Sequence, residues 1–439
     1  MLPKSIKSIK KNSVYHLFSS RDRAKQIMHD LNDLVKLLDG DVNVQKQVIQ
    51  SIQPKNEPFE FRFNGHANSL TNTEINSFSK ALAKLDYTRI LTLTHQKDFI
   101  STDVLATLVE SSRCLRQLDI SYGDILDFSQ LFQAINSDDG DDAANQKGDL
   151  MDNDEEQKCL QSLNISGNHL KFDDAKLLGS QLEKNSSLLA LRLKSCSMKI
   201  DSIIRIIEGL YKNNTLESLD LSRQDRSVDP YNLSCHIQKY FFNNVSTITR
   251  LNLRHLNLTD QCVFNITTGL LNGSNSLKHL DVSNNMLSRD SAKSFVKLLK
   301  GHPLETLNIS YNRLENEGLI EILNCLDSND NNSTSCSKAL SVLIAKTVEA
   351  SGEAWTVAKK ILSAKNATLR EFYIWGNCFK NQIGAAAIKY LIDERRYRSG
   401  RNIDVQPYVV DDVIWMAENG DSGRVAEDTF HEILDSDHY

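Results

Sequence analysis

The sequence predicts an α/β solenoid, in which parallel strands line the inner side and helices cover the outer side. Two observations predict this fold. An eleven-residue pattern of leucine and related apolar residues, with asparagine or cysteine near its end, recurs along the 439 residues. Between the copies, apolar residues are spaced three or four apart, as on one face of a helix. A short strand followed by a helix, repeated at a regular period, is typical of a solenoid.

The recurring pattern is L-x-x-L-x-L-x-x-N/C-x-L, which is the signature of the leucine-rich repeat. Residues 160–170, LQSLNISGNHL, match it at every position. The other copies, from clear to degenerate, begin at residues 188, 277, 304 and 369, then at 115, 216, 248 and 340, and around Phe61/Phe63 and Leu91/Leu93. From residue 160 onward the copies begin 27 to 36 residues apart. This period is typical of the ribonuclease-inhibitor-like class, whose stacked units form a horseshoe.

Each part of the repeat has a mechanical reason. The apolar residues should share one continuous core, because no single repeat buries its apolar face alone. The asparagine near the end of the pattern should bond the backbone where the chain leaves the strand, because its amide both donates and accepts. This position holds Asn168, Asn285, Asn312, Asn377 and, in one copy, Cys196. Several helical segments begin near residue types preferred as helix caps: Asp173, Asp201, Asp260 and Asn316.

The repeats should occupy residues 58–392, between two terminal caps. Residues 1–57 are predicted to be a basic segment and a helical cap, and 393–439 a C-terminal cap followed by an acidic tail. Two inserts interrupt the repeats. Residues 137–157 hold nine acids and one lysine, which predicts a disordered loop, and residues 327–338 are polar.

Composition and motifs exclude several function classes. A net charge of −6 with 25% charged residues argues against a strongly basic nucleic-acid binder. No run of about 18 apolar residues predicts a membrane span, and the basic N-terminus lacks a signal-type apolar run, so we expect an intracellular protein. No phosphate-loop, dinucleotide-binding, HExxH or CxxC motif occurs. We therefore expect no enzymatic activity, cofactor, metal or small-molecule substrate.

The strand residues that alternate with the buried leucines should form the concave face. Candidates for protein binding there are Arg192, Lys194, Arg223, Arg250, Arg254, His255, Tyr311, Tyr373 and Trp375. The face would be basic in its middle and aromatic at its C-terminal end, and Trp, Tyr and Arg dominate binding hot spots. The alternative is a solvated ladder, with Tyr373 and Trp375 covered by the chain's own tail. Nucleic acid fits less well, because the patch is small and the overall charge is negative.

Two segments near the C-terminus carry a more specific likeness. Tyr373–Asn377 (YIWGN) and Asp404–Asp411 (DVQPYVVD) resemble the C-terminal part of the family of leucine-rich repeat-containing protein thirty-four. The likeness covers about 40 residues, and the repeats extend it less specifically over about 300. The resemblance implies a non-enzymatic intracellular protein associated with ciliated and germ-line cells, and a nucleolar association is also attached to the family. The inserts at 137–157 and 327–338 depart from the family pattern.

Three functions compete at this point. The first is a protein-binding scaffold in a large assembly, with the axoneme of a cilium or flagellum as its place. The second is a regulator of a GTPase, similar to GTPase activators that pair this repeat class with an acidic segment, or a nucleolar or cytosolic adaptor. Here the main acidic run lies in mid-chain, which weakens the likeness to those activators. The third is a ribonuclease inhibitor, which ranks last because cationic targets would be repelled by a basic face.

Overall fold

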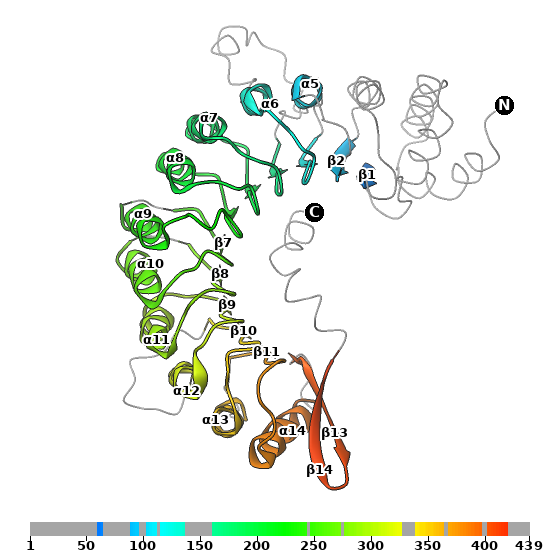
Figure 1. Ribbon diagram of the computed structural model, residues 1–439, viewed down its shortest axis with the longest axis vertical. Coiled ribbons are helices and arrows are strands. Elements are labelled where there is room, and N and C mark those ends of the chain that lie inside the picture. The colour runs from blue at the N-terminus through cyan, green and yellow to red at the C-terminus, as the bar shows by residue number, and fades with distance from the viewer. Residues whose placement is uncertain are drawn as a thin grey trace, which may run out of the picture. The chain divides into compact units, whose positions relative to one another are not determined.

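Figure 1 shows a computed structural model of the chain. It describes residues 59–64, 88–95, 102–111, 115–136, 160–243, 246–273, 276–326, 339–363, 368–396 and 402–419. The predicted N-terminal cap, both predicted inserts and the tail beyond residue 419 lie outside the described residues. The chain divides into two compact units, Met1–Leu216 and Glu217–Tyr439.

In the first unit, parallel strands alternate with helices. Its strands are β1 (Phe59–Asn64), β2 (Thr88–Thr94), β3 (Gln117–Asp119), β4 (Ser162–Asn164) and β5 (Ala190–Arg192). Each pairs in parallel with the next one along the chain. Its helices are α5 (Thr102–Ser111), α6 (Ser129–Ala134), α7 (Phe172–Leu182) and α8 (Ile200–Leu210). Figure 1 shows α7 and α8 side by side on one side of their strands.

The second unit repeats the same arrangement. Its parallel strands are β6 (Ser218–Asp220), β7 (Arg250–Asn252), β8 (His279–Asp281), β9 (Thr306–Asn308), β10 (Val342–Ile344), β11 (Glu371–Tyr373) and β12 (Asn402–Ile403). They pair in this order. Its helices are α9 (Pro230–Asn243), α10 (Asp260–Asn272), α11 (Ala292–Gly301), α12 (Glu315–Cys325), α13 (Gly352–Leu362) and α14 (Gln382–Arg396), with a 3₁₀ turn at Arg289–Ser291. From β3 to β11, each strand begins two residues after the first apolar residue of its repeat.

The repeat leucines and the helix stripes form the core, as the pattern predicts. In the repeat that begins at Leu277, both Leu277 and Leu280 are at most 1% exposed. The stripe of α11, Phe295, Leu298 and Leu299, is also fully buried. Truncating one such leucine to alanine costs about 2–5 kcal/mol, so each repeat depends on its neighbours for stability. The predicted α/β leucine-rich repeat architecture is confirmed.

The asparagine near the end of the pattern, in the four repeats that have it, bonds backbone groups of two repeats. Asn312 donates to the carbonyl oxygens of Val282 and Ile309 at 3.1 and 2.9 Å. Its Oδ1 accepts from the backbone N–H groups of Asn285 and Leu287 at 3.1 and 3.2 Å. Asn168, Asn285 and Asn377 make equivalent sets of bonds. The predicted role of this asparagine is confirmed, and at these four positions it links its repeat to the one before.

The predicted helix caps are wrong in detail. Asp173, Asp201 and Asp260 lie in the first turn of their helices, and the N-cap positions are Lys171, Lys199 and Thr259. Asp260 instead accepts from the N–H and hydroxyl of Ser288, at 2.8 and 2.6 Å. The Asn316 amide likewise donates to the hydroxyl of Ser351 and accepts from its backbone N–H. At two of the four positions, therefore, the polar side chain bonds the start of the next repeat's helical segment instead of its own helix.

An antiparallel hairpin follows β12 at the end of the second unit. It consists of β13 (Val405–Val410) and β14 (Val413–Glu418), and it packs against α14. The side-chain amide of Gln382 bonds both backbone groups of Ile414, at 3.2 and 2.8 Å. These groups therefore point away from β13. Two residues further along the hairpin, Pro407 pairs with Met416. The backbone N–H of another residue in place of Pro407 would also point away from the partner strand, and proline has no N–H. Gln382 and Pro407 thus protect the two hairpin edges from pairing with other strands.

Candidate protein-binding surface

The candidate residues divide between the two units. Arg192 and Lys194, at the end of β5 and just after it, belong to the first unit and are half-buried. The other seven candidates belong to the second unit. We call the sheet side of this unit opposite its helices the inner face (Figure 1). It carries the strand residues that alternate with the buried leucines.

Three candidates lie in the turn that follows a strand. Arg223, His255 and Tyr311 have φ angles of 55, 57 and 56°, in the left-handed region. Residues at the same position of other repeats also have positive φ, including Gly167 and Gly376. The backbone therefore bends sharply here, and the three side chains are exposed at the end of the strand. Tyr311 is 49% exposed.

Arg250 and Arg254 lie on the inner face, at β7 and just beyond it, and both are half-buried. Burial, together with the charge of Arg250, lowers the pKa of His279 on the adjacent β8 to about 4. His279 is therefore neutral at physiological pH. Burial raises the pKa of Asp281, whereas its bonds to Ser283 and the charge of Arg254 act in the opposite direction.

The acids of the inner face around β7 are sequestered. Asp220 and Asp281 are 7% and 5% exposed. Each accepts a backbone N–H at 2.8 Å, from Ser222 and Ser283. Asp281 also accepts from the amide of Asn308, at 2.9 Å. Because these carboxylates are directed at the protein itself, the accessible charge of this part of the face comes from the arginines and is positive.

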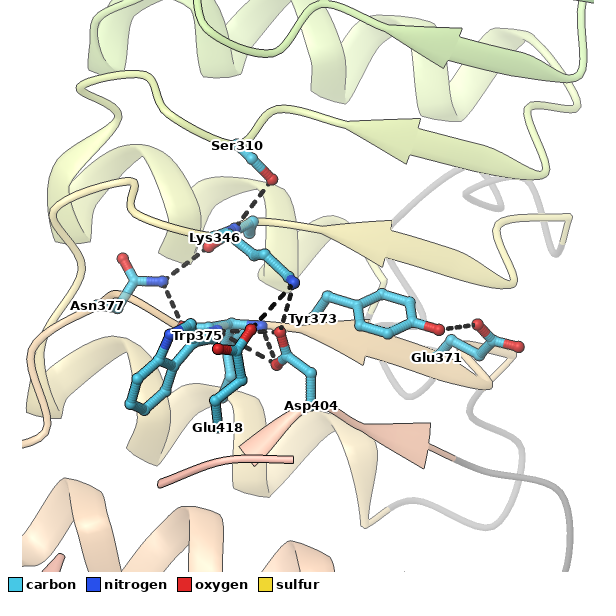
Figure 2. A network of polar contacts seen from close by, with 10 residues as sticks. Ser310, Lys346, Glu371, Tyr373, Trp375, Asn377, Asp404 and Glu418 are labelled. Atoms are coloured by element: carbon cyan, nitrogen blue, oxygen red, sulfur yellow. Dashed lines mark hydrogen bonds and ion pairs between the residues drawn. The ribbon is translucent and has the colours of Figure 1, made fainter. Parts of the chain in front are cut away.

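Tyr373 is not an exposed residue of the inner face, contrary to the first of the two expectations. Its side chain is fully buried, and its hydroxyl donates to Glu371 at 2.5 Å. Burial and this carboxylate raise the pKa of the phenol. Figure 2 shows the Tyr373 ring pointing toward Glu371 and away from half-buried Trp375, so the two rings do not form a joint aromatic patch. Tyr373 clusters with Ile344 and Val342, which occupy inner-face positions of β10.

A buried ionic network closes the end of the inner face, and the sequence did not single it out. Lys346 lies 3.4 Å from Asp404 and 3.9 Å from Glu418 at the end of β14 (Figure 2). Asp404 also accepts from the backbone N–H groups of Ile374 and Trp375, at 2.6 and 3.2 Å. Burial raises the pKa of Asp404, and these two N–H groups and Lys346 oppose the shift. The only sequence signal was that Asp404 opens the DVQPYVVD segment.

Within the described ranges, no group of three or more His, Cys, Asp or Glu side chains is placed to hold a metal ion. None of the helices in this part of the chain is both long and apolar enough to cross a membrane.

Comparison with known proteins identifies the repeat type. Two family models described as leucine-rich repeat match residues 276–298 and 302–323. The human NACHT, LRR and PYD domains-containing protein 13 is 29% identical over 146 residues, 33% of this chain and 14% of that protein. Protein PAC2 of Saccharomyces cerevisiae is 28% identical over 226 residues, 52% of this chain and 35% of that protein. The chain thus matches only a minor part of either relative.

Among solved structures, a chain of the yeast Rad7 and Elc1 complex is similar to this one. The identity is 16% and the TM-score 0.38, over 88% of this chain and 98% of that chain.

Proposed function

We propose that this leucine-rich repeat protein is a non-enzymatic scaffold that binds another protein through the inner face of its second unit. The observation that carries this proposal is the basic surface formed by Arg223, Arg250 and Arg254, beside carboxylates that are buried and bonded internally. Arginine is enriched in binding hot spots, because its guanidinium bonds acidic groups in a fixed geometry and also packs on apolar surface. The favoured partner is therefore a protein that presents an acidic segment.

Tyr311 extends this surface toward the C-terminal end. Its ring is 49% exposed, and its backbone is fixed by the bond from its N–H to the Lys346 carbonyl at 2.8 Å. A rigidly placed aromatic side chain loses little entropy when it is covered by a partner. Tyr373 is removed from the predicted contact set, because its side chain is buried in the unbound protein.

We place this scaffold inside the cell, in the axoneme of a cilium or flagellum. The support is the resemblance of Tyr373–Asn377 and Asp404–Asp411 to the family of leucine-rich repeat-containing protein thirty-four. The two segments are bonded to each other, since Asp404 accepts from the N–H groups of Ile374 and Trp375. The two segments that carry the resemblance therefore meet at the end of the repeat array. Arg223, Arg250 and Arg254, which form the proposed binding surface, lie outside both segments.

The test uses a tagged full-length chain in ciliated cells, followed by detergent stripping and stepwise salt extraction of the axonemes. The proposal expects retention with a fixed set of companion proteins. The variant Arg250→Glu with Arg254→Glu should lose these companions at least tenfold, because its basic patch becomes acidic. The matched control is Lys297→Glu with Lys300→Glu, which also replaces two positive side chains by two negative ones, at exposed positions of α11. This control should retain the companions.

Two results would contradict the proposal in different ways. Equal retention of both charge-reversal variants would remove the inner face as the binding surface. A soluble or nucleolar pool would remove the axonemal placement. In that case, purified GTPases recovered with the protein would be assayed for faster GTP hydrolysis, which is the signature of the regulator.

A further inference from the structure

We infer that the acidic C-terminal segment of this chain, residues 420–439, docks on the inner face of the second unit, across Arg250 and Arg254 and the half-buried Val342 of β10. The segment would then occupy the surface assigned above to a partner protein. The inference concerns a contact within one chain, and it holds or fails independently of the partner's identity.

The first argument is where the segment begins. Glu418, at the end of β14, lies 3.9 Å from the ammonium group of Lys346, which occupies an inner-face position just after β10. The N–H of Asn419 donates to the Asp404 carbonyl at 2.9 Å. Figure 2 shows Glu418, Lys346 and Asp404 gathered at this point. Asn419, the last described residue before the segment, therefore lies beside the inner face, next to the Glu418–Lys346 ion pair.

The second argument is reach. Neighbouring strands lie about 4.8 Å apart, so Arg250 on β7 is about 14 Å from β10 across three strand spacings. Twenty residues span about 66 Å when extended and about 30 Å as a helix. Either conformation can reach β7. Because the segment is tethered, its effective concentration at this face is on the order of millimolar, so a weak contact is sufficient.

The third argument is charge. Residues 420–439 contain six acids and one arginine, a net charge of −5. The facing surface presents Arg223, Arg250 and Arg254, while Asp220 and Asp281 are buried and bonded to backbone N–H groups. The tail and the arginine surface are thus complementary in sign. Complementary charges favour the encounter and fix its orientation.

The fourth argument is apolar surface. Phe430, Ile433 and Leu434 are spaced three and four apart in the tail, as on one face of a helix, with acids between and around them. On the inner face, Val342 and Ile344 of β10 form an apolar cluster with Tyr373. Ile344 and Tyr373 are buried within this cluster, so half-buried Val342 is the apolar side chain that an amphipathic acidic segment could cover.

The docked segment defines the kind of partner. A protein that binds this face must displace residues 420–439, so its own segment should also combine acids with apolar residues. Its apparent affinity is reduced by the fraction of time that the tail occupies the face. The tail therefore acts as an internal competitor that selects partners with a stronger acidic and apolar segment.

The test is photo-crosslinking of the purified full-length chain without a partner. Tyr311, which borders the inner face, is replaced by p-benzoylphenylalanine, and the crosslinked peptide is identified by mass spectrometry. The matched control places the same probe at Tyr390 of α14, which is similarly exposed at 47% and lies against Lys359 of α13 on the helix side. The inference expects the Tyr311 probe to capture a peptide from 420–439 within one chain, and the Tyr390 probe not to do so.

Charge reversal gives a second, independent readout. In the Tyr311 probe protein, Arg250→Glu with Arg254→Glu should lower the crosslink yield at least fivefold. Adding Glu427→Arg, Asp428→Arg and Glu432→Arg should restore it, because the complementary signs are exchanged. Circular dichroism checks that each variant is folded, and restoration by the exchanged charges shows that the loss was electrostatic.

Three results would overturn the inference. They are no crosslink to 420–439 from the Tyr311 probe, a crosslink formed only between two chains, and an equal yield in the charge-reversed protein. If any of these three results occurs while axonemal companions are still recovered through the inner face, the tail inference fails and the proposed function stands. If the crosslink forms but the companions do not depend on Arg250 and Arg254, the proposed function fails and the tail contact stands.

Discussion

Replacement of Asp404 by alanine should open the C-terminal end of the second unit. The carboxylate is fully buried, and its Oδ1 accepts the N–H groups of Ile374 and Trp375. It also lies 3.4 Å from the ammonium of Lys346, whose side chain is 11% exposed. Alanine removes all of these interactions at once (Figure 2). Two backbone donors and one ammonium group are then left in a poorly hydrated place.

The magnitude follows from these contacts. Breaking a buried ion pair by removing one partner costs about 3–5 kcal/mol. Each buried donor left unsatisfied costs about 1–3 kcal/mol, although the terms overlap and are not additive. Glu418 remains 3.9 Å from Lys346 and compensates in part. We therefore expect a loss of about 3 kcal/mol, which corresponds to about a 150-fold larger constant for local opening. Asp404→Asn, which keeps an acceptor oxygen, should lose about half as much.

Amide hydrogen exchange measured by mass spectrometry is the suitable assay, because a long repeat array does not unfold in one cooperative step. Peptides that cover residues 369–377 should exchange about 150-fold faster in the Asp404→Ala protein. Peptides from the first unit, such as 160–170, should be unchanged and serve as an internal reference. The matched control is Glu418→Gln, which removes the other, 43% exposed partner of Lys346. It should cost less than about 1 kcal/mol.

Equal and small effects of Asp404→Ala and Glu418→Gln would refute this reasoning. They would mean that the N–H groups of Ile374 and Trp375 find water or other acceptors, and that Asp404 does not hold the end of the array. A loss of protection spread evenly over both units would also contradict it, because the contacts of Asp404 are confined to the last repeats.

Two further predictions test the packing of the second unit. The pKa of His279 is about 4 in the folded chain and 6.5 when unfolded, so the unfolded chain binds an extra proton between these values. Stability should fall by up to about 3 kcal/mol as the pH drops from 6.5 to 4; thermal melting should show a shallower fall for His279→Gln, and an equally steep fall in this variant would contradict the prediction. Asn312→Ala should cost about 2–4 kcal/mol, because the backbone N–H groups of Asn285 and Leu287 lose their acceptor; unaltered hydrogen exchange at residues 282–287 would contradict this.

The repeat pattern was sufficient to predict most of the fold. Apolar residues at every second position over three to six residues predict a strand, and the asparagine marks where the chain leaves that strand. For this reason even the weak copy at Leu340 corresponds to a paired strand, β10. The helix caps were predicted less well. Asp260 has the residue type of a cap, but it bonds Ser288 of the following repeat. A partner in another repeat leaves no local signal in the sequence.

The candidate surface was predicted only in part, for a related reason. Alternation predicts which side of the sheet a residue faces, and for Arg250, Arg254 and Tyr311 that was sufficient to identify accessible side chains. Exposure, however, depends on what else packs on that side. Tyr373 faces the predicted side and is still fully buried, because β12 and the Lys346–Asp404 pair close the array beside it.

The difference between exposed inner-face side chains and those buried at the end of the array decides where recognition can occur on this chain. At β11 and beyond, inner-face side chains are used to end the array, and replacing them should mainly change stability. From β6 to β8, the acids are buried and bonded internally, whereas Arg250 and Arg254 are half-buried and Arg223 is exposed, so replacing the arginines should mainly change binding. Stability and binding variants are thus predicted to fall on different strands of one face. A binding defect confined to Trp375 or Tyr373 variants that remain fully folded would show that this division is wrong.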